Sequence, residues 1–308
     1  MPAIAAAAPI RIPVCGRDSS AAERYALLTS IRAFEQTLLD LFATGALSGT
    51  THTCLGQETI AAGVLSAIDR ERDIVFSNHR GHGHFLAYCG EVERLFLEIL
   101  GRPGGVCGGR GGSQHLQFRN FYSNGVQGGI VPVTAGMALA EKLKGSPAVS
   151  LAFLGDGTLG EGAVYEAFNI ASLWRLPIVF VIEHNGYAQS TPASLQIAGE
   201  VAARPRAFGI ATEECESTAT ADVLACAARA IDAVRNTGGP RCCVFYPTRL
   251  GPHSKGDDTR SADEMKAAWA FDPLKAARAA LDPAVAEQLD RQAAELMTAL
   301  RARAAEHT

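Results

Sequence analysis

The chain has 308 residues, of which 47% are hydrophobic and 19% charged, and its formal net charge is −4. This length and apolar content allow a sizeable buried core, in one large domain or two modest ones. The small, dispersed negative charge argues against binding to nucleic acid or to an anionic membrane surface, and no apolar run approaches the 18 residues of a membrane-spanning helix.

The N-terminal segment is rich in alanine, is broken by three prolines and lacks the basic start of a secretory signal. We therefore expect residues 1–20 to form a flexible tail and residues 21–308 to form one domain that ends in peripheral helices. The eight cysteines include no Cys-x-x-Cys pair. They are interpreted as small buried hydrophobes rather than as disulfides or a zinc site, which predicts a reducing, cytoplasmic location.

In the N-terminal half, apolar spacing predicts helices over residues 21–44, 58–68 and 91–100 and a short strand over residues 73–76. The loop before the second helix delivers His52 and Gly56 to its start. The strand runs into a segment rich in histidine and glycine, residues 77–84. Residues 101–112 contain too many glycines for a regular element, so we expect them to fold around a ligand or to stay mobile until one arrives.

In the C-terminal half, strands are predicted over residues 148–154, 177–182 and 241–246, and helices over residues 132–143, 160–174 and 219–236. A polar loop is expected over residues 247–263. Asp282 and Pro283 are typical of a helix start and predict a terminal helix from this point. Strands that alternate with helices in this way predict the α/β class, with a parallel sheet that carries helices on both faces.

Two polar clusters follow consecutive predicted strands. Asp156 lies between two glycines after the first strand, and Asn185 follows the second. Because a helix connects these strands, they should be parallel neighbours, and open α/β sheets bind ligands at the carboxyl ends of such strands. A carboxylate, an amide oxygen and a backbone carbonyl suit a Mg²⁺ ion that is also held by phosphate oxygens. The sequence therefore predicts a Mg²⁺–diphosphate site.

This pattern, Gly155-Asp156-Gly157 followed by Asn185, resembles the thiamine diphosphate signature. The wider context, with residues 160–177 and Asn185-Gly186-Tyr187, is similar to the α subunit of the decarboxylating component of 2-oxo acid dehydrogenases. That family includes pyruvate, branched-chain and acetoin dehydrogenases. The resemblance runs from about Arg24 to Asp272 and includes further blocks at Gly56-Gln57-Glu58, Arg80-Gly81-His82-Gly83, Gly111-Gly112-Ser113-Gln114-His115, Val131-Pro132 and His253-Ser254.

The resemblance implies thiamine diphosphate and Mg²⁺ as cofactors, bound by the diphosphate-binding domain of the thiamine diphosphate-binding fold. Asp156 and Asn185 would give side-chain oxygens to the metal, and Tyr187 would give its backbone carbonyl. Arg80 would clamp the diphosphate in a bidentate manner. Further cofactor contacts are expected from Gly125, Gln127, Gly157, Thr158 and His253.

Histidines are the catalytic residues that the resemblance implies. His82 and His253 are expected near the reactive carbon and the diphosphate of the cofactor, where they would orient substrate and stabilise developing charge. His115 would flank the substrate on the same side. Two positions depart from the family pattern. His79 stands where tyrosine is common, which affects a phosphate contact, and His184 stands where asparagine is usual, which affects hydrogen bonding beside the metal rather than metal binding.

The chain accounts for the diphosphate anchor but offers no assigned glutamate to activate the aminopyrimidine ring. The resemblance implies that a β subunit supplies this half, in an α₂β₂ heterotetramer, and that the chain alone is inactive. The expected reaction decarboxylates a small 2-oxo acid and passes the acyl unit to a lipoyl-bearing acyltransferase or carrier protein. Two alternatives stay open: a transketolase-like transfer of a two-carbon ketol or acyl unit to a sugar or carrier protein, and a non-catalytic cofactor-binding subunit.

Overall fold

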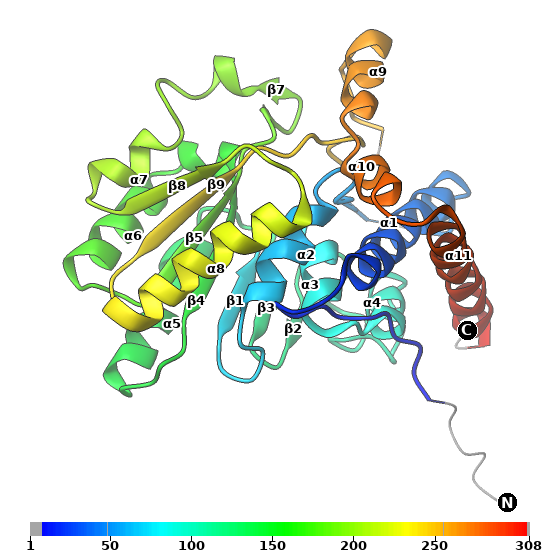
Figure 1. Ribbon diagram of the computed structural model, residues 1–308, viewed down its shortest axis with the longest axis horizontal. Helices are drawn as coiled ribbons and strands as arrows, with labels where there is room; N and C mark the ends of the chain where they lie inside the picture. The colour runs from blue at the N-terminus through cyan, green and yellow to red at the C-terminus, as the bar shows by residue number, and fades with distance from the viewer. Residues whose placement is uncertain (1–7, 48, 255, 307–308) are drawn as a thin grey trace, which may run out of the picture.

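The computed structural model describes residues 8–47, 49–254 and 256–306. A seven-stranded sheet with the order β2-β3-β1-β4-β5-β9-β8 forms its centre (Figure 1). Its strands are β1 (Ile74–Ser77), β2 (Gln117–Phe118), β3 (Phe121–Ser123), β4 (Ser150–Gly155), β5 (Ile178–Glu183), β8 (Ala211–Cys215) and β9 (Arg241–Phe245). All neighbouring pairs are parallel except β2 with β3. The predicted α/β class with a parallel sheet is confirmed.

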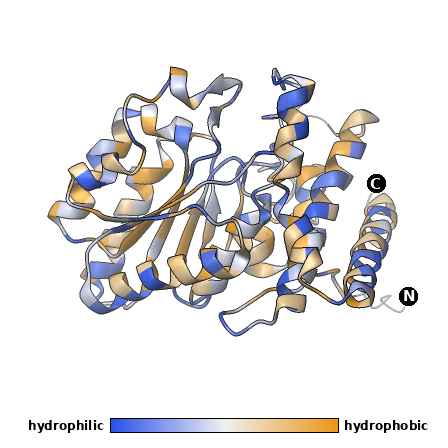
Figure 2. Cartoon of the chain, turned by 45° about the horizontal axis from the view of Figure 1, so that its top comes forward, coloured by the Kyte–Doolittle hydropathy of each residue, from blue (hydrophilic) through white to orange (hydrophobic). Residues whose placement is uncertain are grey.

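Both faces of the sheet are buried, because alternate side chains of each central strand enter different apolar cores. In β4, Leu151 and Phe153 belong to one core, whereas Ala152 and Leu154 belong to the other. The same alternation continues in β5 and β9. Figure 2 shows these strands in hydrophobic colours between helices that carry both hydrophobic and hydrophilic residues. Such burial on both faces explains why the strands read as continuous hydrophobic runs.

Helices cover each face. One core contains residues of α1 (Ala21–Ala43), α2 (Glu58–Ala67), α3 (His82–Cys89), α4 (Val92–Ile99), α8 (Thr220–Thr237), α10 (Pro273–Ala279) and α11 (Pro283–Glu306). The other contains residues of α5 (Ile130–Leu143) and α6 (Gly162–Leu173), and α7 (Ala203–Ala207) contacts β8. Helix α9 (Ala262–Ala270) has no buried residue and projects from the body in Figure 1. The short elements η1 (Asp156–Gly160), β6 (Tyr187–Ala188), β7 (Thr191–Pro192) and η2 (Ala193–Leu195) complete the chain.

Local signals explain several helix ends. Ser20 and Glu23 form a reciprocal capping box at the start of α1. Asp282 accepts a hydrogen bond of 2.9 Å from the backbone N–H of Ala284, which confirms the predicted start of the terminal helix.

The helices and strands differ from those predicted from the sequence in the following places. Residues 82–89 form α3 although they include a glycine and two histidines, because His82 and His84 are buried with hydrogen-bond partners. Strand β8 was missed because three of its five residues are polar, as an edge strand allows. The loop predicted over residues 247–263 ends where α9 begins at Ala262.

The predicted tail, residues 1–20, lies partly outside the described residues, which begin at residue 8. In its described part, Ile12 and Cys15 are buried, and the N–H of Ile12 donates to the carbonyl of Gly90 at 3.0 Å. Arg17 pairs with Asp232 of α8. This part of the segment therefore lies against the domain.

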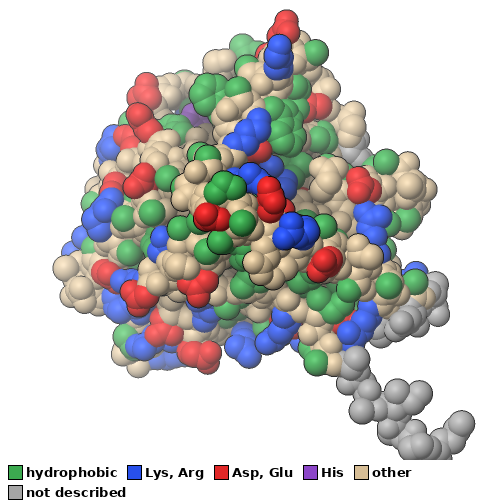
Figure 3. Space-filling view, turned by 45° about the vertical axis from the view of Figure 1, so that its right-hand side comes forward, with side chains coloured by type: hydrophobic (Ala, Val, Ile, Leu, Met, Phe, Trp, Pro, Cys, Tyr) green, Lys and Arg blue, Asp and Glu red, His purple; other side chains and the backbone are tan. Residues whose placement is uncertain are grey.

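Acidic and basic side chains are scattered among hydrophobic and other side chains over the face seen in Figure 3. In the described part of the chain, no helix combines the length and the apolar character that crossing a bilayer requires.

Candidate functional site

A cavity of about 350 Å³ lies at the carboxyl ends of the central strands. Residues that follow β1, β4 and β5 form its walls, and loops after β3 and β9 and before α2 complete it. This edge is where open α/β sheets bind ligands. The lining brings together most of the residues predicted for the site: Arg80, Gly125, Gln127, Asp156, Gly157, Thr158, Asn185, Tyr187 and His253.

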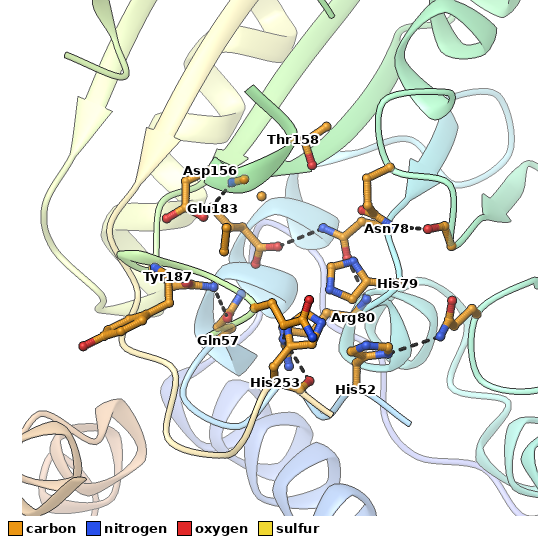
Figure 4. Close-up of a pocket in the computed structure, with 18 of the residues that line it drawn as sticks. His52, Gln57, Asn78, His79, Arg80, Asp156, Thr158, Glu183, Tyr187 and His253 are labelled. Carbon is orange, nitrogen blue, oxygen red and sulfur yellow. Dashed lines mark hydrogen bonds between the residues drawn. The ribbon is translucent and has the colours of Figure 1, made fainter. Parts of the chain in front are cut away.

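One side of the cavity presents oriented oxygen atoms (Figure 4). The buried carboxylate of Asp156 accepts hydrogen bonds from the N–H groups of Gly157 at 2.8 Å and Gly186 at 2.9 Å. It also contacts Nδ1 of His184 at 2.8 Å. An ionised carboxylate has about four acceptor positions, so about one remains for a cation. Asn185 donates from Nδ2 to Oε1 of Gln57 at 3.2 Å. That bond orients the amide, whose oxygen has two acceptor positions.

Tyr187 contacts Asn185 through its backbone. Its N–H donates to Oδ1 of Asn185 at 3.1 Å. The phenol points away from the cavity in Figure 4, and the guanidinium groups of Arg249 and Arg260 each lie 5.6 Å from the centre of its ring. The metal contact of the Tyr187 carbonyl stays a prediction.

The cavity lining also includes a buried arginine, Arg80. Arg80 donates from Nη1 to the carbonyl of Thr53 and from Nη2 to the carbonyl of His253 at 3.2 Å. Asn78 fixes the turn by accepting from the N–H of Arg80 at 2.9 Å. The guanidinium therefore joins two loops of the cavity that Asp156 and Asn185 also line. A polyanion bound in this cavity would meet both Arg80 and a metal ion.

Three histidines meet beside Arg80. The ring centroid of His52 lies 4.5 Å from that of His79 and 4.6 Å from that of His253. Burial, together with His79 and Arg80, lowers the pKa of His52 to about 2. Burial and Arg80 likewise lower the pKa of His79 to about 3 and that of His253 to about 4. The three rings are therefore neutral at neutral pH.

These three rings have potential ligand atoms within 4.8 Å of one another, a spacing that a transition metal could use. The charge of Arg80 opposes a cation at this position, because its Nη2 lies 3.4 Å from Nδ1 of His253. A guanidinium can only donate, so this contact assigns the proton of the neutral ring to Nε2. The cluster is thus better suited to hydrogen bonding with an anion or a carbonyl oxygen.

Two of the predicted catalytic histidines do not line the cavity. His82 is fully buried, with Nδ1 facing the carboxylate of Glu35 at 3.1 Å and Nε2 on the hydroxyl of Ser113 at 2.7 Å. At the start of α3 its ring turns toward α1, and both nitrogens are engaged, so direct contact with substrate does not fit this position. His115 is exposed and also lies outside the lining.

Sequence reasoning did not assign several other residues of the lining. Asn78 and Glu183 follow or end strands β1 and β5, so the strand-end rule could have found them. Gln57 lies in Gly56-Gln57-Glu58, one of the sequence blocks that resemble the family, but it was given no role. His52 comes from a loop far from any strand end, and only the fold brings it to the cavity. The remaining unassigned polar residues of the lining are His79, Gln114, Glu161 and Gln189.

Most of the chain is similar to proteins of a known family. A family model described as "Dehydrogenase E1 component" matches residues 26–297. The α subunit of the pyruvate dehydrogenase E1 component of Zymomonas mobilis subsp. mobilis is 37% identical over 244 residues, 77% of this chain and 68% of that protein. The same subunit of Rhizobium meliloti is 36% identical over 265 residues, covering 83% and 76%.

A third relative is the α subunit of acetoin:2,6-dichlorophenolindophenol oxidoreductase of Bacillus subtilis. It is 35% identical over 237 residues, 76% of this chain and 71% of that protein. The family model spans most of the chain, and the predicted resemblance is confirmed. The chain belongs to the dehydrogenase E1 component family.

Proposed function

We propose that this chain is the α subunit of a heteromeric thiamine diphosphate-dependent enzyme that decarboxylates a small 2-oxo acid and transfers the acyl unit to a lipoyl or similar acceptor. The observation that carries the proposal is the presence of Asp156, Asn185 and Arg80 in the lining of one cavity at the carboxyl edge of the sheet. Membership of the family adds support. Relatives are named for pyruvate and acetoin, which suggests a small substrate.

The donor set fits a Mg²⁺–diphosphate group. Mg²⁺ prefers oxygen ligands and is commonly held by one or two protein side chains together with phosphate oxygens. Asp156, Asn185 and the carbonyl of Tyr187 would hold the ion. The diphosphate would contact Arg80, Gly125, Gln127, Gly157, Thr158 and His253.

Thiamine diphosphate, when bound, supplies a carbon nucleophile and an electron sink for decarboxylation. The neutral rings of His52 and His253 would donate hydrogen bonds to the oxygen on which negative charge develops. Because these rings carry no charge at neutral pH, they bind a carbonyl without adding a further cation beside Arg80. Because Nδ1 of His253 accepts from Arg80, Nε2 carries the ring proton and would be the donor in this role.

The proposal includes a β subunit, in an α₂β₂ assembly, that activates the aminopyrimidine ring. Two further carboxylates of the cavity, Glu161 and Glu183, contact neighbouring residues of this chain, and Oε1 of Glu183 has no hydrogen-bond partner among the described residues. Glu161 accepts from the N–H of Gly128 at 2.9 Å, and Glu183 lies 3.5 Å from the amide nitrogen of Asn78. A separate carboxylate from a partner would complete the site. A lipoyl-bearing acyltransferase or carrier protein in the cytoplasm would accept the acyl unit.

The test compares the purified chain with a complex of the chain and its β partner. Substrates are pyruvate, branched-chain 2-oxo acids, acetoin and ketose phosphates, each with a lipoyl acceptor or with dichlorophenolindophenol. We expect no turnover by the chain alone and turnover of one 2-oxo acid or acetoin by the complex. Turnover of ketose phosphates alone would support the transketolase-like alternative and overturn this proposal.

A further inference from the structure

The glycine-rich segment, residues 101–112, folds around an anion that belongs to the protein itself. Glu98, near the end of α4, is fully buried. Its carboxylate accepts four backbone N–H bonds from this segment, from Cys107 at 2.6 Å and Gly109 at 2.9 Å on Oε2, and from Gly111 at 2.6 Å and Gly112 at 3.2 Å on Oε1. Converging backbone N–H groups of this kind form anion sites in proteins.

The glycines are what allow this close wrapping. A Cβ atom on Gly105 would lie 2.5 Å from Oε2 of Glu98, and one on Gly111 would lie 1.9 Å from the carbonyl oxygen of His115. Gly109 and Gly112 have φ angles of +75° and +59°, which disfavour residues with side chains. The sequence predicted folding around a ligand or mobility, and in the structure the buried carboxylate occupies the place of a ligand.

The segment leads directly into the wall of the cavity. Ser113 meets His82, which Glu35 holds from the other side. The amide of Gln114 then reaches Nδ1 of His52 at 3.3 Å and lines the cavity. Glu98 thus fixes the backbone as far as Gly112, two residues before Gln114, and the side chain of Gln114 contacts His52.

We propose that Glu98 is a positioning residue, whose carboxylate holds residues 105–112 in one conformation and so places Gln114 against His52 before a ligand binds. Glycine-rich backbone has a large conformational entropy to lose, and four charge-assisted hydrogen bonds offset that loss. A glutamine at this position would offer one acceptor oxygen, and its NH₂ group would face N–H donors. The consequence for catalysis rests on the function proposed above.

The variant Glu98→Gln tests this role in the full chain together with its β partner. The matched control is Glu93→Gln on the same helix, where the buried carboxylate accepts from the N–H of Ile10 at 2.7 Å instead. Trypsin cleavage after the exposed Arg110 reports local opening of the segment. We expect cleavage at this bond to accelerate at least about tenfold in Glu98→Gln and to change less than about twofold in the control.

Two further measurements protect the test against a variant that does not fold. In the wild-type protein, amide hydrogen exchange at Cys107, Gly109, Gly111 and Gly112 should be slower than at Arg110, although all five lie in a loop. The shorter carboxylate of Glu98→Asp should restore part of the resistance to trypsin. The proposal would be overturned if these four amides exchanged as fast as that of Arg110 in the wild type, or if trypsin cleaved Glu98→Gln no faster than the wild type.

Steady-state kinetics and cofactor binding test whether Glu98 affects catalysis. In the complex with the β partner, Glu98→Gln should lower kcat about tenfold and change the Kd of thiamine diphosphate less than about threefold, because Arg80, Asp156 and Asn185 come from other loops. If the segment loosens and kcat is unchanged, the positioning role is wrong. If the wild-type complex turns over no substrate, the proposed function fails, whereas the cleavage and exchange results still decide the role of Glu98 in the loop.

Discussion

His184 donates a hydrogen bond from Nδ1 to Oδ2 of Asp156 over 2.8 Å. An ionised carboxylate only accepts, so the ring carries its proton on Nδ1. The bond links the residues that follow β4 and β5, and it orients the carboxylate that faces the cavity. The family usually has asparagine at position 184, and the imidazole supplies a hydrogen-bond donor there.

This relationship predicts that His184→Ala weakens Mg²⁺-dependent binding of thiamine diphosphate about tenfold, the lower end of the range for losing a hydrogen bond behind a metal ligand. His184→Asn should keep most of the affinity, because the amide can also donate. Calorimetric titration of the cofactor in excess Mg²⁺ measures both variants. Equal affinity of the alanine variant and the wild type would show that this bond does not orient the ligand.

The histidine cluster predicts an unusual response to pH. The pKa values of His52, His79 and His253 are lowered to about 2, 3 and 4, whereas an imidazole in an unfolded chain takes up its proton near pH 6.5. As pH falls below about 6.5, the unfolded state binds protons that the folded state refuses, so the folded state loses stability. The loss for the buried His52 approaches about 1.4 kcal/mol per pH unit.

Ring signals of these histidines in NMR spectra, assigned with single His→Asn variants, should not titrate between pH 5 and 8. Stability of His52→Asn, measured by urea unfolding, should fall less between pH 6.5 and 5 than stability of the wild type. Titration of all three rings near pH 6.5 would mean that the cluster is solvated and charged at mildly acidic pH.

Much of the fold was predictable because the apolar runs of β4, β5 and β9 are buried on both faces and read clearly in the sequence. The strand-end rule then placed Asp156, Asn185 and Arg80 at one edge of the sheet, and the structure brings them to one cavity. In these regions, local pattern and tertiary packing agree.

The remaining differences have tertiary causes. His82 lies in a matched block beside Arg80, yet the helix that begins at His82 directs its ring toward Glu35. No local pattern reveals that direction, because it depends on packing of α3 against α1. His52 joins the site through contacts with residues 79 and 253, which are far away in sequence. The partner of the glycine-rich segment, Glu98, belongs to the preceding helix and carries no ligand-binding signature.

The contrast between His253 and His82 is testable. His253→Ala should lower kcat about a hundredfold or more, as expected for loss of a group that assists the reaction, with a smaller change in cofactor affinity. His82→Asn should instead lower the free energy of unfolding by about 1–3 kcal/mol, because it leaves Glu35 and Ser113 without their common partner. Steady-state kinetics and urea unfolding of both variants separate the two roles. Unchanged turnover in His253→Ala would remove that residue from the site.

Arg80→Lys tests the bidentate contact that we propose between Arg80 and the diphosphate. The guanidinium reaches Thr53 and His253 on two loops, and a lysine ammonium cannot present the same planar pair of donors. We expect about tenfold weaker or worse cofactor binding, with the far-ultraviolet circular dichroism spectrum unchanged. The control is Arg175→Lys, a surface arginine that bonds to the carbonyl of Thr237 away from the cavity. Equal losses in both variants would point to a general effect of arginine removal.

The most direct test of the central claim is calorimetric binding of thiamine diphosphate to the wild-type complex and to Asp156→Ala, each with Mg²⁺ and with a chelator. The account predicts binding to the wild type that requires Mg²⁺, and no Mg²⁺-dependent binding to the variant while its circular dichroism spectrum stays the same. Wild-type affinity in Asp156→Ala, at the same Mg²⁺ concentration, would contradict the assignment of the metal and of the diphosphate site built around it.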